Sequence, residues 1–158
     1  MKSEGDVLHD IAGLLQNRAL WCAAAAWFAA QALKIPTYWL VEKRLDWRRF
    51  FGSGGMPSSH TAFVVALAIM VGATTGFDTA AFAVAAVLAF IVMYDASGVR
   101  RETGVQGKVL NEIIRKVIVD GQPITDVELK ELVGHTKLEV AGGFLAGLLT
   151  ALGFIFLS

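Results

Sequence analysis

Long uncharged stretches alternate with short polar ones along this chain. Four stretches carry no Asp, Glu, Lys or Arg, at residues 19–33, 61–77, 79–94 and 140–158. Each predicts a helix that crosses a bilayer, because about 20 apolar residues span the hydrocarbon core and the shorter stretches can lengthen into their polar flanks. The pattern therefore predicts an all-α integral membrane helical bundle with about four transmembrane helices.

The polar segments fix the expected topology. Residues 35–59 include Arg44, Arg48 and Arg49, so this segment is too polar to cross and returns to the side that it left. A tight turn at Gly76 connects the second and third spans on the opposite side. Residues 105–134 are polar and stay on the first side until the fourth span begins, so both termini are expected on the opposite side.

Two segments outside the spans show helical spacing of apolar residues. In residues 105–134, apolar side chains recur from Val109 to Ile118 with charged residues between them, and a second short helix follows that Gly134 closes. Residues 7–16 have similar spacing and suit an interfacial helix before the first span. We therefore expect amphipathic interfacial helices within one domain that covers residues 1–158.

Composition supports the membrane assignment and excludes some classes of function. Of the 158 residues, 55% are hydrophobic and 18% are charged, which is too apolar for an ordinary soluble domain. A formal net charge of zero gives no electrostatic support for nucleic acid binding. The one cysteine, Cys22, cannot form a disulfide within the chain.

Basic residues are distributed unevenly across the predicted membrane. Twelve of the fourteen Lys and Arg residues lie on the side of the 35–59 segment, and only Lys2 and Arg18 lie on the other. Loops that remain in the cytoplasm carry such an excess of positive charge. We expect an integral protein of the bacterial inner (plasma) membrane, with the 35–59 segment facing the cytoplasm.

A glycine-rich turn opens the second span. Gly54 and Gly55 precede Met-Pro, then Ser58, Ser59 and His60 lead into the uncharged helix. Glycines let backbone N–H groups turn toward an anion, serines can cap the helix or donate to the same oxygens, and the helix N-terminus adds positive potential. The same residues are also ordinary turn and N-cap chemistry, so the turn alone leaves both interpretations open.

Other residues with plausible chemistry are expected at the same membrane surface. They are Lys34, Asp95, Arg100, Arg101, His135 and Glu139. Cations, backbone N–H groups, two histidines and a carboxylate together suit a phosphate ester that is held, attacked and given a proton on leaving.

The order of these motifs resembles a known family. Lys34, the Pro-Ser-Ser-His60 turn and Arg100-Arg101 look like the lysine, Pro-Ser-x-His and arginine elements of the type-2 phosphatidic acid phosphatase superfamily. The Gly-Gly-Met-Pro-Ser-Ser-His turn, with Asp-Ala-Ser-Gly-Val-Arg-Arg and Gly-His-Thr after it, resembles more closely the small divergent bacterial and plastid branch. The resemblance covers residues 33–147.

One departure from the superfamily concerns the histidine that follows the arginine. Arg101 is followed by Glu102, and no histidine comes until His135, which keeps a spacing of four to the carboxylate of Glu139. We interpret residues 105–134 as an insertion that separates the two halves of one motif.

The resemblance implies two-step phosphoryl transfer through a phosphohistidine, with no metal and no cofactor. It makes His135 the nucleophile, Glu139 its orienting partner and His60 the acid and base. The predicted phosphate-binding groups are Lys34, Gly54, Gly55, Ser58, Ser59, Arg100 and Arg101, with Asp95 beside the arginines as an ion-pair partner.

Each role has a structural alternative. His60 and His135 can be polar residues at helix starts, and Thr136 with Glu139 can form a capping box. Lys34 can snorkel from a helix end, and Arg100 and Arg101 can bind lipid headgroups.

The implied function is hydrolysis of a lipid phosphomonoester such as phosphatidylglycerophosphate or phosphatidic acid in the bilayer. An isoprenoid (polyprenyl) diphosphate phosphatase would use the same residues, and a non-catalytic protein that binds anionic lipids would use the basic face alone. The small residues Gly142, Gly143, Ala146 and Gly147 suit close helix packing, so a homo-oligomer is also expected.

Overall fold

All regular secondary structure in the described part of the chain is helical. The structure is a computed structural model that describes residues 12–52, 54–98, 106–107, 110 and 136–157. Its elements are α2 (Arg18–Glu42), the 3₁₀ helix η1 (Trp47–Phe51), α3 (Ser59–Thr75), α4 (Ala80–Ser97) and α6 (Lys137–Phe156). The predicted all-α class is confirmed for these residues. The predicted amphipathic elements at 7–16 and 105–134 lie largely outside the described residues.

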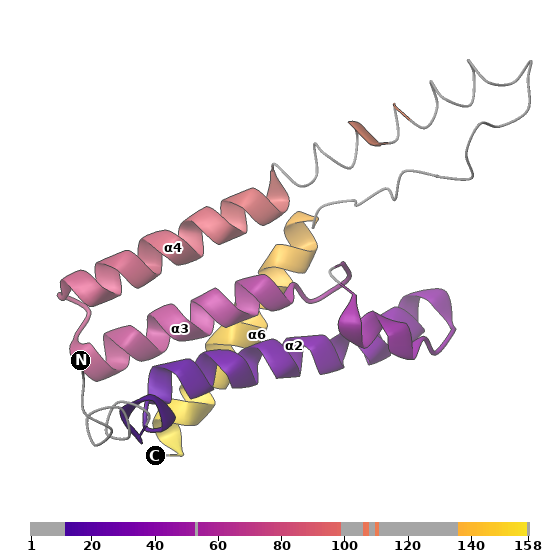
Figure 1. The fold of residues 1–158 in the computed structure, drawn as a ribbon. Helices are drawn as coiled ribbons and strands as arrows, with labels where there is room; N and C mark the ends of the chain where they lie inside the picture. The colour runs from indigo at the N-terminus through magenta and orange to yellow at the C-terminus, as the bar shows by residue number, and fades with distance from the viewer. Residues whose placement is uncertain (1–11, 53, 99–105, 108–109, 111–135, 158) are drawn as a thin grey trace, which may run out of the picture.

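Helix α3 is the centre of the bundle. It packs against α2, α4 and α6, and α6 crosses behind α3 and α2 (Figure 1). Consecutive helices run in opposite directions, so the end of α2, the start of α3, the end of α4 and the start of α6 lie at one end of the bundle. We call this the motif end. It brings together the helix ends that the polar segments of the sequence predict on one side of the bundle.

Two described helices, α4 and α6, are long and apolar enough to cross a membrane. Helix α3 is apolar but has 17 residues, or about 26 Å of helix at 1.5 Å per residue. The four predicted stretches therefore all form helices, and two of these helices meet the length and composition expected of a membrane span.

Helix α2 is longer than the sequence pattern predicts. The pattern places the end of the first span near Lys34, with Pro36 just beyond it, whereas the helix continues through Pro36 to Glu42. Proline removes one backbone donor, but membrane helices tolerate it where Ser or Thr side chains satisfy nearby groups. Here the Thr37 hydroxyl oxygen lies 2.8 Å from the carbonyl oxygen of Leu33, next to Ala32, whose carbonyl Pro36 leaves without its helical donor.

Small residues set the distance between α6 and α3. A Cβ atom on Gly143 would overlap the carbonyl oxygen of Ser58, and one on Gly147 would lie 2.6 Å from the carbonyl oxygen of Ala62. Backbones approach this closely only where no side chain intervenes. At these two glycines, the small-residue face that suits oligomerisation therefore packs against α3 of the same chain.

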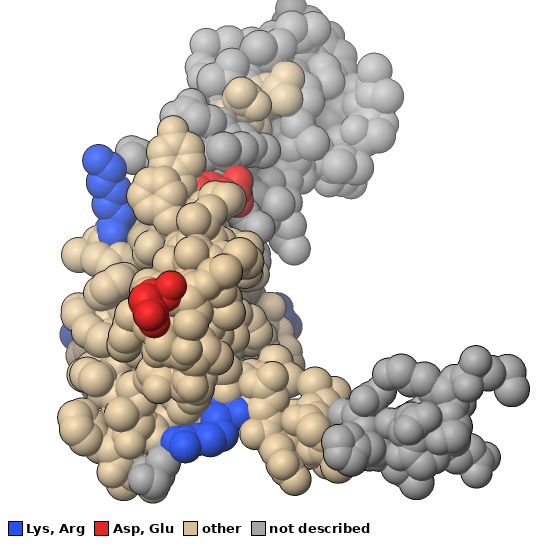
Figure 2. All heavy atoms as spheres, turned by 90° about the vertical axis from the view of Figure 1, so that its left-hand side faces the viewer, with Lys and Arg blue, Asp and Glu red and all other residues tan. Residues whose placement is uncertain are grey.

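The outside of the bundle is apolar. Helix α4 buries mainly Ala85, Ala89 and Ala96, while large side chains such as Val84 and Phe90 are exposed. Figure 2 looks at the end opposite the motif end and shows mostly uncharged atoms with few charged groups. The large apolar side chains exposed along α4 fit contact with lipid chains rather than with water.

We predict that Gly143→Ala lowers the thermal unfolding midpoint of the detergent-solubilised protein. The added methyl group must displace the α3 backbone, and overpacking of this kind costs about 1–3 kcal/mol. Gly153→Ala is the matched control, because nothing lies within 4 Å of its Cβ position and alanine is the better helix former. Equal midpoints for the two variants would contradict the close α3–α6 contact.

Candidate functional site

The turn between η1 and α3 is the centre of the candidate site. It runs from Gly52 to Ser58, and Gly55 has a φ of +94°, in the left-handed region that glycine adopts without strain. Ser58 is the N-cap of α3, and its hydroxyl oxygen accepts from the backbone N–H of Thr61, at 3.4 Å. The turn therefore delivers the chain directly to the positive end of a helix.

Helix α2 holds two carbonyl groups of this turn. The Lys34 ammonium donates to the carbonyl of Gly52, with 2.9 Å between Nζ and oxygen. One turn further along α2, the Thr37 hydroxyl donates to the carbonyl of Met56, at 2.5 Å. Residues three apart share one face of a helix, so a single face of α2 fixes the turn at two points.

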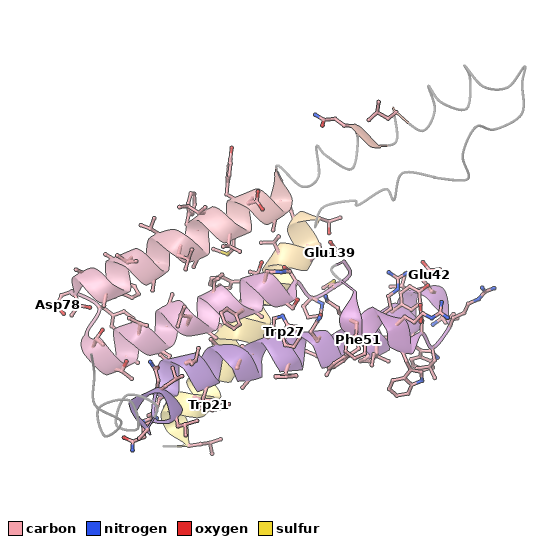
Figure 3. All side chains as sticks on the ribbon, viewed as in Figure 1. Trp21, Trp27, Glu42, Phe51, Asp78 and Glu139 are labelled. Atoms are coloured by element: carbon pink, nitrogen blue, oxygen red, sulfur yellow. The ribbon has the colours of Figure 1, made fainter. Side chains whose placement is uncertain are left out.

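Helix α6 holds the other end of the turn. The backbone N–H of Ser58 donates to the carbonyl of Glu139 in the first turn of α6, at 2.9 Å. Beside it, a Cβ atom on Gly142 would lie 3.2 Å from Met56 Cε, so the absence of a side chain there makes room for the turn. Figure 3 shows Glu139 at the start of α6, above the loop that enters α3.

Polar side chains at the start of α3 differ in exposure. Ser58, Ser59 and Thr61 are buried, and the Ser58 hydroxyl oxygen also lies 3.1 Å from the hydroxyl of Thr61. His60, between them, is exposed at the motif end. The imidazole of His60 is therefore accessible, while the hydroxyls of Ser58 and Thr61 take part in the contacts at the helix start.

Lys34 is a buried cation with an acidic neighbour. Its side chain is 2% exposed, just beyond the uncharged residues 19–33. Burial of the ammonium lowers the pKa of Lys34 below the ordinary value for lysine, and the negative charge of Glu139 raises it in part. Charge from α2 and charge from α6 therefore interact across the turn.

Glu139 forms the capping box that the sequence offers as an alternative to its catalytic role. Its Oε2 accepts from the backbone N–H of Thr136, at 2.8 Å, and its own N–H donates to the Thr136 hydroxyl, at 3.2 Å. The carboxylate thus has an observed structural role at the start of α6 and an electrostatic influence on Lys34.

Comparison with known proteins identifies the family. The sequence pattern described as the Divergent PAP2 family matches residues 15–150. The chain belongs to this family. It is also 39% identical to a protein of Bacillus subtilis (strain 168) called uncharacterized membrane protein YuiD, over 88% of this chain and 94% of that protein. No solved structure matches the chain.

Several predicted site residues of this PAP2-like membrane protein lie together at the motif end. They are Lys34, Gly54, Gly55, Ser58, Ser59, His60 and Glu139. Asp95 lies in the last turn of α4, partly buried, at the same end of the bundle. Arg100, Arg101 and His135 lie outside the described residues. In the part of the chain that is described, no three His, Cys, Asp or Glu side chains are placed to hold a metal ion.

Sequence reasoning missed Thr37 and Gln31. Thr37 could have been found as the polar residue three positions after Lys34, on the same face of α2. Gln31, three positions before Lys34, is buried, and its Oε1 has no hydrogen-bond partner within the described part of the chain. Gln31 could have been found as a polar residue in an apolar helix, close to Lys34.

We predict that Thr37→Val destabilises the protein more than Thr74→Val. Both hydroxyl oxygens lie 2.8 Å from a carbonyl oxygen of their own helix, but only the single proton of Thr37 can also be directed to another element, at the carbonyl of Met56. Loss of that bond should lower the free energy of unfolding by about 1 kcal/mol, measured by thermal or denaturant unfolding in detergent. Equal effects of the two substitutions would show that the Thr37 hydroxyl does not hold the turn.

Proposed function

We propose that this Divergent PAP2 family member is a membrane phosphatase that hydrolyses a lipid phosphomonoester. The observation that carries the proposal is the turn at residues 52–58, which α2 and α6 hold at the N-terminus of α3 beside an exposed histidine. A fixed turn with glycines at a helix N-terminus suits a phosphate group. The phosphatases that this family resembles act on such groups.

The proposed reaction has two steps. His135 attacks phosphorus, the bond from phosphorus to the ester oxygen breaks, and His60 gives a proton to the departing alcohol. His60 then takes a proton from water as the water oxygen attacks the phosphohistidine, which releases inorganic phosphate and restores His135. Glu139 would orient His135 in addition to its observed capping role.

Positive groups would hold the phosphate oxygens during both steps. An ammonium has three N–H donors, so the bond from Lys34 to Gly52 leaves two for a bound phosphate. The amides of Gly54 and Gly55 and the guanidinium groups of Arg100 and Arg101 would complete the set. Charge on the equatorial oxygens is greatest as the phosphoryl group transfers, so these contacts would stabilise the transition state most.

The orientation suggested by the basic residues narrows the choice among candidate substrates. A cytoplasmic motif end suits phospholipid synthesis, so phosphatidylglycerophosphate or phosphatidic acid is favoured over an isoprenoid diphosphate recycled on the outer face. If a membrane-impermeant reagent labelled a cysteine placed at Arg49 from outside intact cells, this orientation would be wrong.

A second candidate function is the binding of anionic lipids without catalysis. The observation that favours it is the capping box, which accounts for Glu139 with no catalytic role. Release of phosphate from a panel of lipid phosphates in detergent would distinguish the two functions.

We predict that His135→Ala abolishes both phosphate release and an acid-labile phosphoenzyme. His60→Ala should stop hydrolysis of natural lipids but still form phosphoenzyme from a substrate with a good leaving group, which needs no proton donor. His9→Ala is the matched control, since His9 is the one remaining histidine of the chain's three and has no predicted role in the site. Removal of metal ions with a chelator should leave activity unchanged.

Three results would contradict this scheme. Phosphoenzyme that persists in His135→Ala would move the nucleophile elsewhere, with Asp95 the next residue to test. Full hydrolysis with no phosphoenzyme in any variant would indicate direct attack by water. Phosphate release from none of the lipids by the folded wild-type protein would favour the non-catalytic function.

A further inference from the structure

One exposed segment at the motif end takes no part in the proposed reaction. It comprises residues 39–51, from the last turn of α2 through η1, and we call it the 39–51 edge. It leads directly into the turn at Gly52. Figure 3 shows Glu42 and Phe51 on this segment, at the motif end and away from the bundle core.

Large apolar side chains on the 39–51 edge are exposed rather than packed. Val41 is 78% exposed, Trp47 is 72% exposed and Phe51 is 86% exposed, and Trp39, Leu40 and Leu45 are also exposed. Exposing this much apolar surface to water is unfavourable. Because the segment lies at the end of α2 in a membrane protein, the headgroup region of the bilayer can cover these side chains. Trp and Tyr residues are enriched in that region.

Basic side chains lie among these apolar ones. The edge has Lys43, Arg44, Arg48 and Arg49 against Glu42 and Asp46, an excess of two positive charges in a chain of zero net charge. Arg49 is engaged locally: its Nε lies 3.8 Å from Asp46 Oδ2, and its guanidinium carbon lies 4.1 Å from the centre of the ring of Tyr38, the residue just before the edge. Lys43, Arg44 and Arg48 are exposed and can reach a charged surface.

The edge has a fixed shape. The Asp46 carboxylate accepts from the backbone N–H of Arg48, at 3.0 Å, which starts η1, and the backbone N–H of Lys43 donates to the carbonyl of Trp39, at 2.9 Å, which ends α2. The bond from Lys34 to Gly52 ties the end of η1 to α2. The basic and aromatic groups therefore have a defined position relative to the turn.

We propose that the 39–51 edge is a docking surface for anionic phospholipids of the bilayer leaflet. Aromatic side chains enter the headgroup region, and Lys43, Arg44 and Arg48 bind the phosphates of neighbouring lipids. This binding sets the depth of the turn at residues 52–58 relative to the lipid phosphates. It requires no hydrolysis, so it stands or fails independently of the proposed phosphatase activity.

Tryptophan fluorescence in lipid nanodiscs tests the proposal. A full-length variant that retains only Trp47 is placed in phosphatidylcholine discs with a fixed fraction of brominated phosphatidylglycerol or of brominated phosphatidylcholine, and bromine quenches the nearby indole. We expect stronger quenching of Trp47 by the anionic lipid. Lys43→Gln, Arg44→Gln and Arg48→Gln together should remove this preference, with a loss of roughly tenfold or more in local enrichment.

Two controls separate a local site from general attraction. A variant that retains only Trp21, at the opposite end of the bundle (Figure 3), should show no preference between the two lipids. Lys137→Gln, which neutralises an exposed base at the start of α6, should leave the Trp47 preference intact. Equal quenching of Trp47 by both lipids, or a preference that survives the triple substitution, would overturn the proposal.

Native mass spectrometry provides a second measurement that keeps all four tryptophans. Wild-type protein extracted from mixed lipids should retain phosphatidylglycerol over phosphatidylcholine, and the triple Gln variant should lose that selectivity. Equal lipid retention by both proteins would overturn the proposal even if the single-tryptophan variants failed to fold.

Discussion

The close contact between α6 and α3 is the constraint on which the candidate site depends. Without side chains at Gly143 and Gly147, the α6 backbone lies against the carbonyl groups of Ser58 and Ala62. This proximity places the carbonyl oxygen of Glu139 2.9 Å from the backbone nitrogen of Ser58, which donates to it. A hydrogen bond between residues so far apart in the chain then fixes the start of α3, which is where the proposed phosphate site lies. Packing in the apolar interior thus determines the geometry of a polar surface.

The second support of the site comes from α2, through a cation that the apolar interior would otherwise disfavour. Lys34 is buried, and burial of an unpaired charge is unfavourable. The carbonyl of Gly52 and the negative charge of Glu139 compensate for this burial. Lys34 therefore ties α2 to the turn and lies within the electrostatic influence of Glu139 on α6. In the proposed function the same ammonium would meet a phosphate dianion, so structural and functional roles are compatible in one residue.

The order of the helices and their shared end could be predicted from the sequence, because uncharged runs and the polar segments between them leave few topologies. The turn at residues 54–60 and the capping box at Thr136 could be predicted as well, since both depend on local sequence. The continuation of α2 through Pro36 could not, because tertiary contacts of Thr37 and Lys34 stabilise it. The sequence also could not predict that the α6 glycines pack against α3 of the same chain, because small residues favour close packing equally within a chain and between chains.

The most direct test of the central claim is hydrogen exchange at the turn. A non-hydrolysable phosphonate analogue of phosphatidic acid is added to the protein in lipid nanodiscs, and amide exchange is followed by mass spectrometry. Because the claim is that phosphate binds at the α3 N-terminus, exchange should slow at residues 54–61 and at the start of α6. Slower exchange confined to residues 39–51, with no change at 54–61, would show that the headgroup binds the edge alone and would contradict the account.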